Sequence, residues 1–128
     1  MKILLDTHAL LWWFTDDPKL SLVARGLIGD DTNDVFVSAA SAWEIATKQR
    51  IGKLDGVPDA TARFSELVVM NGFTHLPITY QHSLLAGNYR CSHRDPFDRI
   101  LAAQSEVESI ILVTRDPAFK MFGNETIW

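Results

Sequence analysis

The chain has 128 residues, of which 47% are hydrophobic, and its formal net charge is -4. A chain of this length suits one compact domain that buries roughly two-thirds of its unfolded surface, and the apolar content excludes a disordered protein. The acidic balance disfavours non-specific binding of nucleic acid through a broadly basic surface, unless cations fill the acidic groups or basic residues gather locally.

The first half of the chain alternates short apolar runs with helical patterns. We predict buried strands at Lys2–Leu5 and Val35–Val37, because continuous apolar runs are typical of a parallel sheet covered on both faces. A helix containing Trp12 follows the first strand, and apolar residues at helical spacing predict another over Leu20–Ile28. Ser41–Arg50 is predicted as a helix that Gly52 stops.

The second half continues this alternation. The predicted helices are one around Phe64–Val68, one at Thr79–Ala86 ended by Gly87-Asn88, and one from Asp95-Pro96 to about Val107. The predicted strands are Ile110–Val113, a weaker candidate at Phe73–Leu76, and a possible edge strand at Thr126–Trp128. We therefore expect a single α/β domain over residues 1–128, with a mainly parallel sheet.

Ligands of such sheets bind outside the carboxyl ends of the strands. Several acidic residues of this chain are predicted to lie at those ends. Asp6 directly follows the first strand, and Asp116 follows Ile110–Val113. Glu44 is predicted in the first turn of the helix after Val35–Val37, and Asp98 in the first turn of the Asp95-Pro96 helix. We expect these carboxylates to lie at one edge of the sheet.

Each acid also has a purely structural interpretation. Ser41 and Glu44 have the spacing of a capping box, and Asp95 with Asp98 is a similar device. Asp116 before Pro117 is typical of an N-cap. Asp6 has no capping role unless a helix starts at Thr7 or His8.

Considered jointly, the acids predict a metal site. Four carboxylates close together repel one another, and desolvation raises their pKa values further, so the cluster is costly unless a cation fills it. Hard oxygen ligands with few histidines favour Mg²⁺ or Mn²⁺, the ions that commonly serve phosphate-ester chemistry.

The order of several segments resembles PIN-domain proteins, specifically the VapC-type toxins of toxin–antitoxin pairs. The matching segments, which cover nearly the whole chain, are Ile3–His8, Ser41–Ile45 running on to Gly52–Leu54, Arg94–Arg99 and Leu112–Asp116. The resemblance implies a PIN-like three-layer α/β/α sandwich. It also implies a Mg²⁺- or Mn²⁺-dependent endoribonuclease that cleaves RNA with a metal-activated water.

The same resemblance assigns roles to residues. Asp6, Glu44, Asp98 and Asp116 would form the catalytic and metal-binding site, with Asp6 and Asp98 as principal ligands. Asp98 is taken rather than Asp95 because it matches the family aspartate within Phe-Asp-Arg.

Several neighbours of the acids are candidates for substrate binding. Thr7 and Thr114 would be polar neighbours of the acidic site in the resembled family. Arg99 and Arg115 adjoin Asp98 and Asp116, and they would contact phosphates or else form an ordinary solvated surface.

Partners and location are inferred from other features of the sequence. Trp12-Trp13-Phe14 wraps around a helix, so part of this run is expected in the core and part in an exposed patch for a partner. The resemblance implies a cognate antitoxin bound near the site, and a homodimer. The single cysteine, Cys91, favours a reducing, cytoplasmic compartment, and no apolar stretch is long enough to predict membrane insertion.

Three other function classes stay open at this point. An aspartate-based phosphohydrolase of the aspartyl-phosphate type begins with a strand and Asp-x-Asp, but this chain has His8 at the third position. A receiver domain would need a phospho-accepting aspartate in the middle of the sheet, which the sequence does not identify. A non-catalytic binding module with a PIN fold is the other alternative.

Overall fold

Five parallel strands form the centre of the protein, in the order β3-β2-β1-β4-β5. The computed structural model describes residues 1–54, 56–57 and 59–128. The strands are β1 (Lys2–Leu5), β2 (Asp34–Ser38), β3 (Thr74–Leu76), β4 (Ile111–Val113) and β5 (Thr126–Ile127). The mainly parallel α/β sheet expected from the sequence is confirmed, including the two weaker strands.

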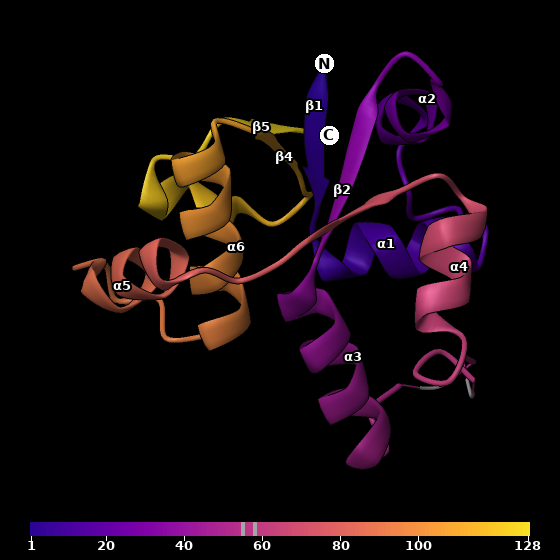
Figure 1. Ribbon diagram of the computed structural model, residues 1–128, viewed down its shortest axis with the longest axis horizontal. Coiled ribbons are helices and arrows are strands. Elements are labelled where there is room, and N and C mark those ends of the chain that lie inside the picture. The colour runs from indigo at the N-terminus through magenta and orange to yellow at the C-terminus, as the bar shows by residue number, and fades with distance from the viewer. Residues whose placement is uncertain (55, 58) are drawn as a thin grey trace.

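Helices cover both faces of this sheet (Figure 1). They are α1 (Thr7–Phe14), α2 (Leu22–Gly29), α3 (Ala39–Arg50), α4 (Phe64–Met70), α5 (Tyr80–Asn88), α6 (Pro96–Glu108) and the 3-10 helix η1 (Pro117–Phe122). No helix among the described residues has the length and apolar character needed to cross a membrane.

The two faces of the sheet carry separate hydrophobic clusters because side chains alternate along a strand. Ile3 and Leu5 of β1 pack in a cluster with residues of α1, α2 and α4. Leu4, between them, packs in a second cluster with α6 and η1. All three are fully buried, which explains why the strand is continuously apolar and confirms the three-layer sandwich.

Several helix boundaries differ from the prediction by one or two residues. The helix predicted from Ser41 begins at Ala39, because Ser38, the last residue of β2, accepts a hydrogen bond from the Ala40 N–H (2.9 Å). The helix predicted to end at Gly87-Asn88 runs through Asn88. Asp95 and Pro96 begin α6 as predicted, and Ser109 ends it in the left-handed conformation (φ 55°).

The strand order reverses at β1. The chain builds β1, β2 and β3 outward in one direction and then returns to place β4 on the other side of β1. A crevice forms at the carboxyl ends of the strands where such a reversal occurs, and ligands of open α/β sheets bind there. The topology thus predicts a ligand-binding site at the residues that follow β1 and β4.

The Ser38 hydroxyl links the start of α3 to α6. It donates to Gln104 Oε1 (2.5 Å) while it caps α3, and Ser38 and Gln104 are both fully buried. We predict that Ser38→Ala lowers the free energy of unfolding by about 1–3 kcal/mol, because it removes the cap and leaves a buried amide oxygen without its donor.

Urea denaturation measures this loss, and Ser21→Ala is the matched control. Ser21 caps α2 through the Ala24 N–H (3.0 Å), so its removal should cost about 1 kcal/mol or less of stability. Equal losses for the two variants would contradict the proposed contribution of the link to Gln104.

Candidate active site

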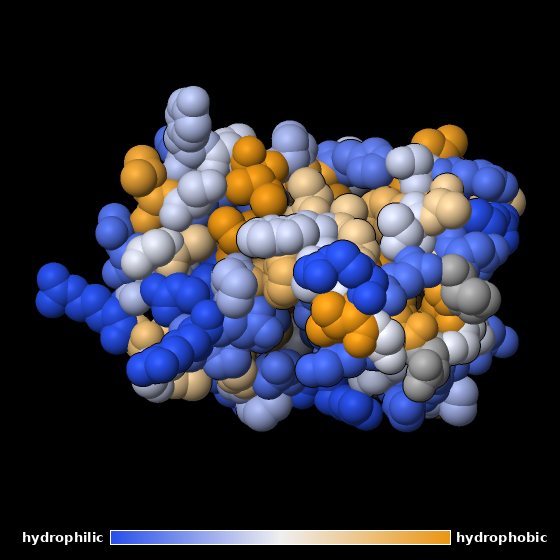
Figure 2. Space-filling view, turned by 90° about the horizontal axis from the view of Figure 1, so that it is seen from below, coloured by the Kyte–Doolittle hydropathy of each residue, from blue (hydrophilic) through white to orange (hydrophobic). Residues whose placement is uncertain are grey.

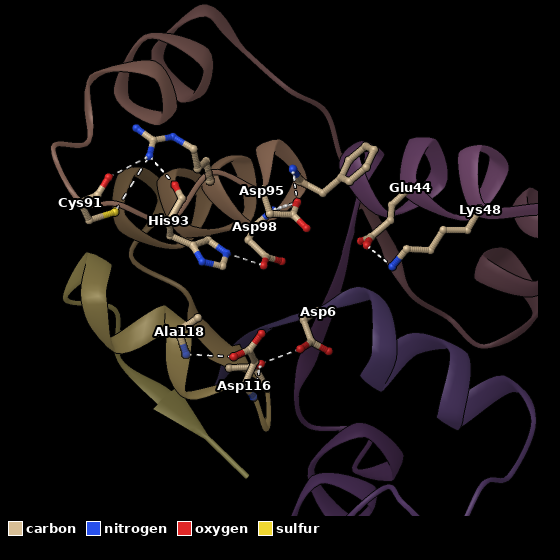
Figure 3. Close-up of polar contacts among 12 residues, drawn as sticks. Asp6, Glu44, Lys48, Cys91, His93, Asp95, Asp98, Asp116 and Ala118 are labelled. Carbon is tan, nitrogen blue, oxygen red and sulfur yellow. Dashed lines mark hydrogen bonds and ion pairs between the residues drawn. The ribbon is translucent and has the colours of Figure 1, made fainter. Parts of the chain in front are cut away.

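The four predicted acids surround one space at the carboxyl ends of β1 and β4 (Figure 3). Asp6 follows β1, and Asp116 lies between β4 and η1. Glu44 comes from α3 and Asp98 from α6, on the opposite side of this space. Segments far apart in the sequence therefore place these carboxylates around one edge of the sheet, where we expected them.

Asp6 is buried, with 5% of its surface exposed. Its Oδ1 accepts from the Ala9 N–H (2.7 Å). Because α1 begins at Thr7, Asp6 is the N-cap of this helix. Its Oδ2 accepts from the Thr114 hydroxyl (2.5 Å). Burial raises the pKa of Asp6 above its ordinary value, although both hydrogen bonds oppose this effect.

Glu44 is buried to a similar degree, with 4% of its surface exposed. The capping-box interpretation of Glu44 is wrong, because Ser38 caps α3 and Glu44 consequently lies in the second turn, not the first. Ser41 pairs instead with the Thr7 hydroxyl (3.0 Å). Glu44 Oε2 forms an ion pair with Lys48 (2.6 Å), which compensates part of the cost of burying its charge.

Asp95 caps α6, as the Asp95-Pro96 pattern predicted, and Asp98 does not. Asp95 Oδ1 accepts from the N–H groups of Phe97 (2.9 Å) and Asp98 (3.2 Å), so Asp95 is the cap of α6. The Asp98 carboxylate is free of that role, and its Oδ2 lies 2.8 Å from His93 Nε2. Burial raises the pKa of Asp98 to about 6, and the charges of Asp95 and Glu44 act in the same direction.

Asp116 is exposed and caps η1 through the Ala118 N–H (2.9 Å), so its predicted capping role is confirmed. Its own N–H donates to Thr114 Oγ1 (3.0 Å). The same Thr114 hydroxyl donates its hydrogen to Asp6. One threonine hydroxyl therefore fixes the residues after β1 and β4 relative to each other.

The two arginines predicted to bind substrate have different environments. Arg99 donates to the backbone carbonyl oxygens of Ala86 (2.8 Å), Tyr89 (2.5 Å) and His93 (2.7 Å), so it orders the connection between α5 and α6. Arg115 is exposed, and its guanidinium lies 4.5 Å from the centre of the Trp12 ring. Arg115 is thus the arginine that is available to a ligand.

The contact between His93 and Asp98 was not predicted. The two residues are five apart, and the contact depends on the connection that Arg99 orders. No spacing rule for metal ligands or helical faces includes this pair, so the sequence carried no signal for it.

The donor set fits a hard divalent cation. Its members are carboxylate oxygens, and the charge of Glu44 raises the pKa of both Asp6 and Asp98, so the three groups share one electrostatic environment. Within the described part of the chain, no three acidic, histidine or cysteine side chains already stand in coordinating positions. Mg²⁺ keeps several waters and needs only one or two carboxylates, so it suits such an open arrangement.

The fold and the site together define a class: a parallel α/β/α sandwich with an acidic centre at the point where its strand order reverses. The chain belongs to the PIN domain family, whose model matches residues 3–124. The resemblance inferred from the sequence segments is confirmed at this level. No curated protein matches the chain.

Several solved structures share the fold. FitAcB from Neisseria gonorrhoeae matches with a TM-score of 0.72 and 19% identity, over 98% of this chain and 96% of that chain. DNA-bound VapBC from Salmonella typhimurium matches with a TM-score of 0.71 and 16% identity, over 99% and 97%. VapBC2 from Rickettsia felis, bound to a promoter DNA fragment, matches with a TM-score of 0.69 and 16% identity, over 100% and 98%.

The raised pKa of Asp98 predicts how stability depends on pH when divalent metal is removed. Its folded pKa of about 6 exceeds the value near 3.9 expected in the unfolded chain, so the folded state binds more protons between these values. Lowering the pH from 7 towards 4 should therefore stabilise the folded state through this group. Asp98→Asn should stabilise the metal-free protein at pH 7.5, and this advantage should shrink as the pH falls through 6.

Urea titrations in a chelator, from pH 7.5 to 4.5, measure the difference between the two proteins. Asp31→Asn, at an exposed position, is the control and should change stability little at any pH. If Asp98→Asn is clearly less stable than wild type at pH 7.5, the Asp98 charge does not destabilise the metal-free protein, and a structural role for Asp98 is indicated.

Proposed function

We propose that this protein is a divalent-metal-dependent endoribonuclease and the toxin of a type II toxin–antitoxin pair. The observation that carries this proposal is the group of four acids around one space at the strand reversal of a PIN fold (Figure 3). The solved structures of similar fold include toxin–antitoxin complexes, which supports the biological part of the proposal.

Asp6 and Asp98 would hold Mg²⁺ or Mn²⁺, with Glu44 and Asp116 beside them. The bound ion would supply charge neutralisation at the phosphate and lower the pKa of a water molecule. Thr114 and the Ala9 N–H fix the orientation of the Asp6 carboxylate, and His93 fixes that of Asp98. The site is thus oriented before substrate arrives.

Glu44 and Asp116 are the groups that would orient the attacking water and accept its proton. Glu44 has one oxygen paired with Lys48, and Asp116 has one oxygen at the Ala118 N–H. Water would attack phosphorus, the bond to the 3′ oxygen would break, and that oxygen would take a proton from solvent. The products are therefore a 5′-phosphate and a 3′-hydroxyl.

The face that carries the site is suited to a charged substrate. The carboxyl ends of β1 and β2 point to the lower end of the molecule in Figure 1, and Figure 2 looks onto that end. Hydrophilic residues dominate the lower half of this view, and the apolar patches are scattered. Single-stranded RNA is the favoured form, because bases within an A-form helix are difficult for a protein to contact.

Removing the acids should stop cleavage without unfolding the protein. Loss of a positioned proton acceptor typically lowers the rate about 10²–10⁴-fold, so we expect losses of this size in Glu44→Gln and Asp116→Asn. Asp6→Asn should reduce both cleavage and metal binding. Cleavage of single-stranded RNA with Mg²⁺ or Mn²⁺, followed by analysis of the new ends, measures these effects.

Asp95→Asn is the matched control, because asparagine is also a good helix cap and Asp95 is not assigned to the reaction. It should retain most of the activity. Products with 2′,3′-cyclic phosphate ends, or undiminished cleavage in EDTA, would contradict the mechanism. Failure of wild type to cleave any RNA would favour the non-catalytic PIN module.

The aromatic run on α1 is less exposed than the sequence predicted. Trp12, Trp13 and Phe14 are each half-buried against the main cluster, and none of the three is strongly exposed. A groove of about 560 Å³ does lie beside α1, with an apolar lining that includes Leu11, Trp12, Leu54 and Val57 and with Lys19, Lys48 and Lys53 also among its lining residues. We propose that an antitoxin segment with apolar and acidic side chains binds there.

A second copy of the chain would occupy a different surface. Trp43 and Leu84 are strongly exposed, and Trp43 borders an apolar groove of about 260 Å³ between α3, α5 and α6. This surface is the one we propose for the homodimer.

Reversal of one charge in the groove should weaken the antitoxin complex. We predict that a protein co-purifies with wild type from the native host, and that Lys53→Glu reduces its recovery because the exposed Lys53 lies in the groove lining. Lys2→Glu, at the amino end of β1, is the control and should leave recovery unchanged. Absence of any co-purifying protein would count against the toxin–antitoxin assignment.

A further inference from the structure

Two aromatic rings on α1 lie beside the acids and take no part in the proposed chemistry. His8 and Trp12 are one helical turn apart, and their rings stack with centroids 5.5 Å apart and planes at 26°. Trp12 is half-buried and is supported edge-on by Trp128, with centroids 5.9 Å apart. His8 is exposed. The pair is therefore a stack of two rings in which Trp128 holds Trp12 edge-on and His8 stays accessible.

This pair lines two hollows at once. One has a volume of about 260 Å³ and is also lined by Asp6, Arg115, Asp116 and Pro117. The other is the groove of about 560 Å³, to which Lys19 and Lys48 contribute. The rings thus lie between the acids and a group of cationic side chains. A phosphodiester at the acids would place its neighbouring base beside the rings.

Cations already cover part of the Trp12 ring. The Arg115 guanidinium lies 4.5 Å from the ring centre, and Lys19 Nζ lies 6.0 Å from it. An exposed cation–π contact contributes only about two- to fivefold in an equilibrium constant. A base stacked on an aromatic side chain contributes about 5- to 150-fold. A base would therefore displace Arg115, whose guanidinium would then be free to contact a phosphate.

We propose that His8 and Trp12 form a stacking platform for one base of single-stranded RNA next to the phosphate at the acids, with Arg115 as its cationic neighbour. This inference rests on the proposed ribonuclease function and adds a base-binding subsite to it. The smaller hollow favours a nucleotide over an apolar peptide, because four of its six lining residues have polar or charged side chains: Asp6, His8, Arg115 and Asp116.

Binding of two single-stranded probes tests the platform. One is a twelve-nucleotide oligoadenylate, and the other is a ribose-phosphate backbone of the same length without bases. Fluorescence anisotropy with Ca²⁺ in place of Mg²⁺ gives both dissociation constants. Wild type should bind the oligoadenylate at least about fivefold more tightly than the abasic backbone.

The variants separate stacking from packing. Trp12→Leu and His8→Ala should each remove most of the preference for bases, whereas Trp12→Tyr should keep it. Binding of the abasic backbone should change little in any of them. Trp13→Leu is the matched control: its ring packs towards Phe73 and its N–H bonds Asn71 (3.0 Å), so the preference should persist. Thermal melts verify that each variant is folded, and His8→Ala tests the platform independently should Trp12→Leu fail to fold.

The possible outcomes distinguish this inference from the function on which it rests. Cleavage of RNA with an unchanged preference for bases in both variants would overturn the platform and leave the ribonuclease. A preference for bases that depends on Trp12, in a protein that cleaves nothing, would support the platform and refute the ribonuclease. If wild type binds neither probe, or if Trp12→Leu loses only the co-purifying protein, the platform is overturned.

Discussion

The buried carboxylate of Asp6 is the constraint on which the site depends. It lies directly after β1, the central strand. The Ala9 N–H in the first turn of α1 and the Thr114 hydroxyl both donate hydrogen bonds to it and fix its orientation. Burial still raises its pKa, so its charge is not fully compensated by these donors. The remaining electrostatic cost of the Asp6 charge falls at the place where the topology forms a crevice, as is typical of a functional site.

The Thr114 hydroxyl also fixes the segment after one strand relative to the segment after the next. It accepts from the Asp116 N–H while it donates to Asp6, so the segments after β1 and β4 have a fixed relation. On the other side of the site, Ser38 and Gln104 tie α3 to α6, which carry Glu44 and Asp98. Two short hydrogen-bonded links thus set the relative positions of four acids that no single element holds together.

The sequence was sufficient for the sheet and for the position of Asp6 and Asp116 at its edge, because both depend on local patterns. Continuous apolar runs identify buried parallel strands, and acids directly after such strands lie at one edge. The environment of Glu44 was not predictable, since Ser38 and Ser41 are both plausible caps and only the end of β2 decides between them. The burial of Trp13 and Phe14 depends on Phe73, which is distant in the sequence. Long-range contacts of this kind leave no periodic signal.

Asp6 is poorly suited to the covalent role that an aspartyl-phosphate enzyme requires. A nucleophilic carboxylate needs an oxygen that substrate can approach, but Asp6 is 5% exposed and both of its oxygens accept hydrogen bonds. A metal ligand needs only one oriented lone pair, which a carboxylate retains after accepting one bond on each oxygen. The geometry therefore favours an electrostatic role for Asp6 over a covalent one.

The net charge of -4 is compatible with RNA binding once the charges are located. The acids of the site are grouped where a divalent cation would offset them, whereas Lys48 and Lys53 lie in the groove beside α1 and Arg115 lies over Trp12. Phosphate contacts depend on such local charge rather than on the total. Lys48 has a further effect, since its ion pair with Glu44 joins the basic groove to the acidic site. A phosphate near Lys48 would therefore compete with Glu44 for its ammonium group.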